Sequence, residues 1–153
     1  MVITNAEIRI SNADALLHGL KLGQLNLRMS DELKNRTKKF ALDVIGLCSG
    51  LPHILETRHA IGQVIRSSSS VAANYRSACR GKSKVDFIAK LGIVEEEADE
   101  SGFWLEMLCD IAKLRHLPID AWASTELARL VGEANQLVAI TVASRKTARG
   151  SDR

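Results

Sequence analysis

The stretch Arg66–Glu100, RSSSSVAANYRSACRGKSKVDFIAKLGIVEEEADE, decides the fold because its pattern predicts two long helices joined by a tight turn. Apolar and small residues recur here at alternating steps of three and four, which places them on one helical face. The two seams are Ile61, Val64, Ser68, Val71, Tyr75 and Ala78, then Phe87, Leu91, Val94, Ala98, Ser101, Leu105, Leu108 and Ala112. Between them we expect Gly81 to be the left-handed residue past a helix end, and Ser83 with Asp86 to form a capping box. The stretch therefore predicts a helical hairpin.

The same spacing predicts one further helix on each side of this hairpin. Apolar residues between Leu33 and Leu47, and between Ala123 and Thr141, again recur at steps of three and four. We expect the helices to run from Ser30 as N-cap to Gly50 and Pro52, from His53 or Ile54 to Arg80, from Lys84 to about Arg115, and from Asp120 as a cap to a frayed end at Arg145–Arg149. Four long helices with short loops predict an all-α fold, an antiparallel up-down-up-down four-helix bundle over residues 29–148.

The two ends of the chain lack this regular pattern. Residues 1–28 show no sustained periodicity, so we expect an irregular or weakly structured N-terminal extension, with a short docked helix near Ala13–Leu22 as the alternative. At the other end, residues 149–153 are predicted to form a basic flexible tail.

Length and composition place the chain among ordinary soluble proteins. Its 153 residues suit one domain, and 25% charged with 46% hydrophobic residues is typical of a globular protein. No stretch approaches the roughly 18 consecutive apolar residues of a membrane span, and no secretory signal pattern is present. We therefore predict a cytoplasmic protein that has no membrane partner.

Charge is distributed unevenly along the hairpin. Between Arg58 and Gly92 there are seven Lys and Arg residues against one Asp, whereas Ile93–Asp110 contains seven acids and no base. Such a distribution creates local fields that the net charge of +3 conceals.

Three arginines before the turn share one helical stripe, which lies away from the apolar seam. They are separated by small residues, so their guanidinium groups are free for bidentate contacts with phosphate. Two lysines continue the stripe around the turn. The predicted nucleic-acid-binding residues are therefore Arg66, Arg76, Arg80, Lys82 and Lys84. The alternative, which can hold for some arginines and not for others, is that they pair with the acidic face of the following helix, in the same subunit or in a neighbouring one.

The four serines Ser67–Ser70 lie beside this stripe. Serine is a mediocre helix former, so the run needs a reason. In one interpretation the small side chains let another helix approach closely, and their hydroxyls bond back to helix carbonyls. In the other they border a surface that meets phosphate.

A second apolar stripe on the helix after the turn predicts a subunit interface. Trp104, Met107, Ile111 and Leu114 lie beside the core seam and widen the apolar arc beyond what one bundle core needs. An exposed patch of this kind marks a partner surface. We expect these four residues to join the subunits of a cyclic homo-oligomer.

No set of residues in the sequence dictates a catalytic or metal chemistry. The three cysteines Cys48, Cys79 and Cys109 border apolar seams at different ends of the bundle, so we interpret them as reduced core residues. Glu56 and His59 form one Glu-x-x-His pair, whereas di-iron bundles carry two. No catalytic triad, phosphate-binding loop or dinucleotide motif is present. We predict no enzyme activity, catalytic residue, metal, cofactor or small-molecule substrate.

A resemblance to a known family covers about Met29–Thr147. It rests on DELKNRTKKFALDVI at Asp31–Ile45 and on the later pattern Arg66, Ser70, Asn74, Arg76, Arg80, Lys84, Phe87, Glu95, Glu96 and Glu100. The chain resembles the four-helix bundle proteins first noticed as products of intervening sequences in bacterial large-subunit ribosomal RNA genes. That family is similar in turn to the accessory protein of diversity-generating retroelements. The resemblance implies a homopentameric barrel of bundles whose basic surface binds RNA or DNA, with residues 1–28 as an upstream extension or the result of a mis-chosen start.

Two classes of function remain on the sequence alone. The first is a non-catalytic, oligomeric accessory protein that binds nucleic acid through its arginine stripe. The alternative is a scaffold for protein–protein interaction that does not bind nucleic acid. Strong salt dependence of binding to random RNA would separate the two.

Overall fold

The computed structural model describes residues 30–150 of the chain. The predicted N-terminal extension, and residues 151–153 of the predicted tail, lie outside the described residues, so both stay predictions. Nearly all of the bundle belongs to the compact unit that begins at Lys34, whose boundary falls within the first turn of the first helix.

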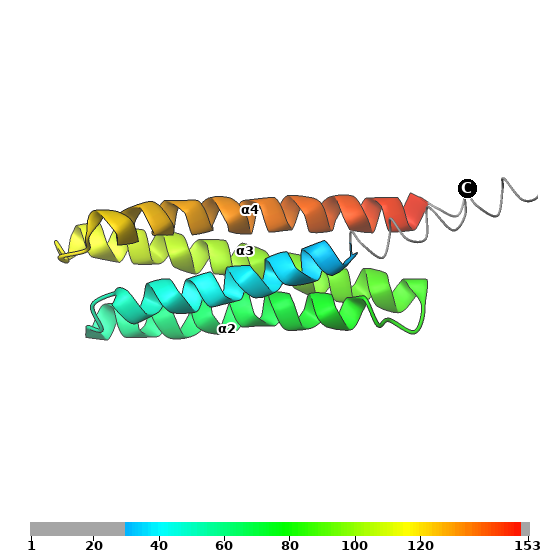
Figure 1. Ribbon diagram of the computed structural model, residues 1–153, viewed down its shortest axis with the longest axis horizontal. Helices are drawn as coiled ribbons and strands as arrows, with labels where there is room; N and C mark the ends of the chain where they lie inside the picture. The colour runs from blue at the N-terminus through cyan, green and yellow to red at the C-terminus, as the bar shows by residue number, and fades with distance from the viewer. Residues whose placement is uncertain (1–29, 151–153) are drawn as a thin grey trace, which may run out of the picture. The chain divides into compact units, whose positions relative to one another are not determined.

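Four helices make up the described residues, and no strand occurs among them (Figure 1). The first covers residues 30–50, and it is followed by α2 at Leu55–Ala78, α3 at Lys84–Leu114 and α4 at Ala121–Gly150. The all-α prediction is confirmed. Two details differ from expectation: Ser30 is itself helical and so is not the flanking N-cap, and α4 is helical through Gly150.

Consecutive helices run in opposite directions (Figure 1). In each antiparallel pair, the number of the contacted residue falls along one helix as the residue number rises along the other. The cross-helix ion pairs follow this order: Glu56 with Arg115 and Arg66 with Glu97 between α2 and α3, and Arg36 with Glu133 and Asp43 with Arg129 between helix 30–50 and α4.

The core consists of the apolar seams that the spacing predicted. Every predicted seam position is buried in α2, from Ile61 to Ala78, and in α4, from Ala123 to Thr141. In α3 the seam is buried from Leu91 to Ala112, while Phe87 in the first turn is half-buried. Each fully buried leucine or valine side chain contributes about 1.5–3 kcal/mol relative to an exposed one, so the four seams together hold the bundle.

The turn between α2 and α3 corrects one prediction. No described glycine has a positive φ, so Gly81 is not the left-handed residue that we expected. Glycine is needed there for space: a Cβ on Gly81 would lie 3.0 Å from the carbonyl oxygen of Ala78. Only half of the predicted capping box forms. Ser83 Oγ accepts the Asp86 N–H at 3.1 Å, but the Asp86 carboxylate accepts the N–H of Lys82, not that of Ser83.

Small residues bring α3 close to both of its neighbours. Ser67 and Ser101 are fully buried where α2 meets α3, and their hydroxyls are hydrogen-bonded at 2.9 Å. On the other side, a Cβ on Gly102 would lie 3.6 Å from the Cβ of Ala134 in α4. The close-packing interpretation of the serine run therefore holds for Ser67 and Ser68, whose hydroxyls also donate to carbonyls of their own helix.

Candidate nucleic-acid interface

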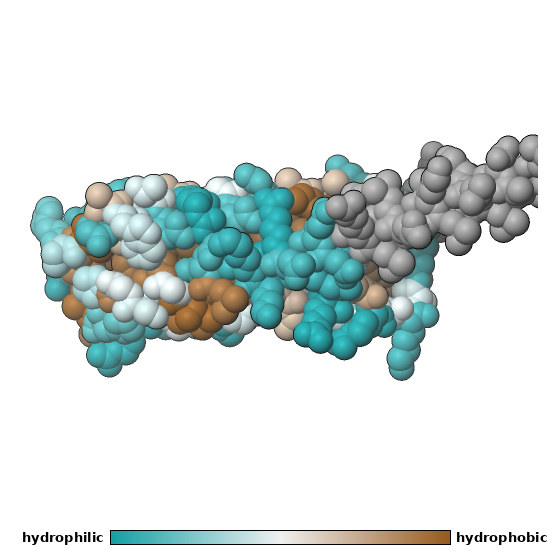
Figure 2. Space-filling view, viewed as in Figure 1, coloured by the Kyte–Doolittle hydropathy of each residue, from teal (hydrophilic) through white to brown (hydrophobic). Residues whose placement is uncertain are grey.

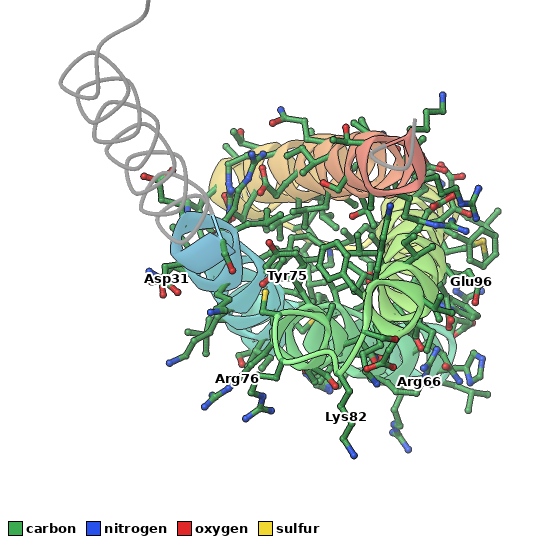
Figure 3. All side chains as sticks on the ribbon, turned by 90° about the vertical axis from the view of Figure 1, so that its right-hand side faces the viewer. Asp31, Arg66, Tyr75, Arg76, Lys82 and Glu96 are labelled. Carbon is green, nitrogen blue, oxygen red and sulfur yellow. The ribbon has the colours of Figure 1, made fainter. Side chains whose placement is uncertain are left out.

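The five predicted nucleic-acid-binding residues lie in different surroundings. Figure 3 shows Arg66, Arg76 and Lys82 pointing outward from the bundle. Arg80 is likewise exposed. Lys84 is only partly exposed, and its ammonium nitrogen is buried. The structure therefore separates the predicted stripe into parts that are available to a ligand to different degrees.

Arg66 is held by the acidic face of α3. Its guanidinium donates to Glu97 at 3.2 Å and also to Glu100, which in turn accepts the indole N–H of Trp104 at 3.1 Å. The hydrogen bond from Arg66 lowers the pKa of the Glu100 carboxyl, so the carboxylate is charged at neutral pH. For Arg66, the structure shows the intramolecular ion pair that the sequence left open.

Arg76 and Arg80 line an open groove between helix 30–50 and α2. Lys34 and Lys38 of helix 30–50 line the groove with them, and its volume is about 740 Å³. Among the described residues that line it there are four Lys and Arg and no Asp or Glu. We call this feature the basic groove.

The remainder of the basic groove is mostly apolar, apart from Asn35 and Ser69. Leu42 and Ile45 of helix 30–50 are 57% and 39% exposed, and both line the groove. The small residues Ser69, Ala72 and Ala73 line the α2 side opposite them. Figure 2 shows this face: a hydrophobic patch lies over the middle of helix 30–50 and α2, with hydrophilic side chains nearer the start of helix 30–50.

Arginine–carboxylate ion pairs bridge neighbouring helices at the other three helix–helix contacts of the bundle. These pairs are Arg66 with Glu97 and Glu100 and Arg115 with Glu56 between α2 and α3, Arg145 with Glu95 between α3 and α4, and Arg36 with Glu133 and Arg129 with Asp43 between helix 30–50 and α4. The basic groove differs because cations line both of its banks. Positive charges that converge in a concave site raise the local potential and attract anions.

Reasoning from sequence missed the helix 30–50 side of this cluster. Lys34, Lys38, Leu42 and Ile45 recur at steps of four, four and three, next to the core seam of their own helix. The periodic signal was therefore present. Which neighbouring helix the stripe would face depends on how the bundle closes, and the spacing within one helix does not contain that information.

The predicted interface residues on α3 differ in exposure. Leu114 is 77% exposed, whereas Trp104, Met107 and Ile111 are half-buried. The His59 ring of α2 meets the Trp104 ring edge-on and covers part of it. Phe103, which sequence reasoning missed, is 51% exposed and meets the Trp104 ring edge-on at 4.9 Å between centroids. The outer face of α3 thus presents apolar surface next to its acidic residues.

The three cysteines are free thiols, and the predicted core position holds for Cys48 alone. Cys48 is buried, and this burial raises the pKa of its thiol to about 11, while Cys79 and Cys109 are half-buried. Within residues 30–150, no three His, Cys, Asp or Glu side chains converge as metal ligands would. No helix in the described part of the chain is both long enough and apolar enough to span a membrane.

Comparison with known proteins supports this fold. The family model described as 23S rRNA-intervening sequence protein matches residues 30–127. The chain is also similar to a crystal structure from Bacteroides thetaiotaomicron, titled as a protein with unknown function from the S23 ribosomal protein family. The two share 25% identity with a TM-score of 0.61, over 76% of this chain and 97% of the other. No curated protein matches the sequence.

Proposed function

We propose that this chain, which belongs to the 23S rRNA-intervening sequence protein family, is a non-catalytic protein that binds RNA or DNA through its basic groove. The match to the family model confirms the family resemblance seen in the sequence. Nucleic-acid binding, oligomerisation and a place in the cytoplasm go beyond that family assignment and are part of the proposal.

One observation carries the proposal: Arg76 and Arg80 share a groove with Lys34 and Lys38, and no acid is among the described residues that line it. Nucleic-acid phosphates are the anions that such a row of cations suits, because each phosphate accepts charge-assisted hydrogen bonds from guanidinium or ammonium groups. Phosphate contacts position a strand without reading its bases. We therefore expect affinity for RNA and DNA with little sequence preference.

The other predicted residues contribute unequally in this proposal. Lys82 is exposed beside the turn, where it extends the cationic surface. Arg66 contributes less, since phosphate would have to displace Glu97 and Glu100 from it. Lys84, with its buried ammonium, needs a side-chain rearrangement before it reaches a strand.

Assembly of several copies would strengthen such contacts. We propose a cyclic homo-oligomer through the α3 stripe of Trp104, Met107, Ile111 and Leu114, with Phe103 added from the structure. Five subunits are taken from the family resemblance. A ring repeats the basic groove around its circumference, so weak contacts to one strand add through multivalency.

Charge reversal in the groove tests the proposal. The double variant Arg76→Glu/Arg80→Glu should abolish a gel shift with random RNA, while the circular dichroism spectrum stays unchanged. A matched control is Arg58→Glu/Lys113→Glu, which alters net charge equally at two exposed positions near the other end of the bundle. Equal loss in both variants would mean that only net charge matters, and no loss in either would leave the groove without this role.

The exposed apolar surface at Phe103 and Leu114 favours one other function, a scaffold that binds another protein. Under that alternative, wild-type protein shifts neither RNA nor DNA at low salt. The Arg76→Glu/Arg80→Glu variant then behaves like wild type in the gel shift and in the circular dichroism spectrum.

A further inference from the structure

We infer that the basic groove selects single-stranded over double-stranded nucleic acid, because one continuous groove joins a cationic end to an apolar end. This inference rests on the proposed function and adds to it the form of nucleic acid that is bound. Its starting point is the arrangement of two antiparallel stripes, one on helix 30–50 and one on α2.

The two stripes align side chains of like character. Along helix 30–50 the order is Lys34, Lys38, Leu42, Ile45, and along α2 it is Ser69, Ala73, Arg76, Arg80. Because the helices are antiparallel, both lysines come to lie across from both arginines. Leu42 and Ile45 come to lie across from the small residues. On each helix the lined stretch runs over twelve residues, from Lys34 to Ile45 and from Ser69 to Arg80, which is roughly 16 Å at 1.5 Å per residue.

The cationic end of the groove binds the phosphates of the strand in this proposal. Arg76, Arg80 and Lys38 are exposed, and Lys34 lines the groove beside them. Cations on both banks of a groove hold a backbone along the groove axis. Cations on a flat surface would not define such a path.

The apolar end of the groove can contact bases, and a duplex cannot make this contact. In a duplex the base faces are stacked inside, so only phosphates and base edges reach a protein. A single strand can turn a base face onto Leu42 and Ile45, and Ala73 and Ser69 leave room for it. Aliphatic contacts of this kind add affinity with little discrimination between bases.

The small side chains are also what keeps the groove open. Ala73 is exposed on α2 although it lies between two helices, and Ala72 is half-buried beside it. A larger residue here would fill the space between the banks without changing any charge. Ala73→Leu is therefore a specific test of groove occupancy, and leucine suits a helix almost as well as alanine.

Fluorescence anisotropy on the full-length protein tests the inference, with labelled oligouridine as the single strand and its duplex with oligoadenosine for comparison. Ala73→Leu and Leu42→Ser/Ile45→Ser should each weaken single-strand binding about tenfold, as expected for losing apolar contact with one or two bases. Duplex affinity should stay unchanged. The matched controls Ala139→Leu on α4 and Leu55→Ser on α2 alter exposed positions outside the groove and should leave both affinities unchanged.

The outcomes separate this inference from the proposed function. One outcome is that Arg76→Glu/Arg80→Glu abolishes binding, while Ala73→Leu and Leu42→Ser/Ile45→Ser weaken single-strand and duplex binding equally or weaken neither. In that case the proposed function stands and single-strand selection is wrong. If wild-type protein binds neither form, both fail. Binding of an acidic amphipathic peptide that Ala73→Leu prevents, without any RNA binding, would instead make the groove a protein-docking site.

Discussion

His116 carries the left-handed turn that ends α3. It is the one non-glycine residue with positive φ in the described part of the chain, at 48°. The Leu117 N–H donates to the Ala112 carbonyl at 2.9 Å, and the His116 N–H donates to the Lys113 carbonyl at 3.2 Å. These two bonds make a Schellman motif, in which the residue at His116 is usually glycine.

Replacing this histidine should stabilise the protein. A side chain in the left-handed region costs about 1 kcal/mol relative to glycine, which has no Cβ to clash. We expect His116→Gly to raise the free energy of unfolding by about that amount in urea titration. His116→Ala serves as the control, since it keeps the Cβ. A similar gain for both variants would mean that the imidazole, not the backbone, causes the strain.

Residues of one sequence stripe also acquire different roles through their neighbours. Arg66 and Arg76 lie on the same predicted stripe of α2, yet Arg66 meets Glu97 and Glu100 while Arg76 faces the basic groove. The stripe itself followed from spacing. Which arginine meets an acid depends on where α3 crosses α2, and that is decided by the packing of the whole bundle.

At the scale of elements, the seams carry the stability of the bundle. Leu130 lies at the middle of the α4 seam and is completely buried, whereas Leu55 at the start of α2 is 80% exposed. Leu130→Ala should cost about 2–5 kcal/mol, because it removes packed atoms and leaves a cavity. Leu55→Ala should change stability by less than about 0.5 kcal/mol. Thermal or urea unfolding measures both, and a similar cost for the two variants would show that the seam is misplaced.

Most of the elements could be predicted from the sequence, since spacing and capping are local properties. The α3 and α4 starts came from Ser83 and Asp120, and Asp120 does accept the Ala123 N–H at 2.7 Å. The expectation that Gly81 has a positive φ was wrong because a turn can select glycine for either of two reasons. A turn can require glycine for its φ or for close approach to a carbonyl, and only the structure distinguishes them. The Lys34–Lys38 bank stayed hidden for a different reason, since it depends on which helices become neighbours.

At the scale of the whole molecule, the exposed apolar surface of α3 predicts that the protein assembles into a homo-oligomer. Light scattering at micromolar concentration should give the mass of an oligomer, because exposed Leu114 and Phe103 are costly to leave in water. Trp104→Glu should reduce that mass to a monomer. Since Trp104 is half-buried, Leu114→Glu at a 77% exposed site separates loss of interface from loss of fold. A monomeric wild-type protein would contradict the assembly.

The central claim is that phosphate binds at Arg76 and Arg80, and the salt dependence of RNA affinity tests it most directly. Each phosphate contact adds about 0.7–0.9 to the slope of log affinity against log salt concentration. Anisotropy titrations between about 50 and 200 mM salt should therefore give a steep fall for wild type. Arg76→Gln/Arg80→Gln should flatten the slope by about 1.5, while Arg58→Gln/Lys113→Gln leaves it unchanged. A slope that is the same in wild type and in the groove variant would contradict the account.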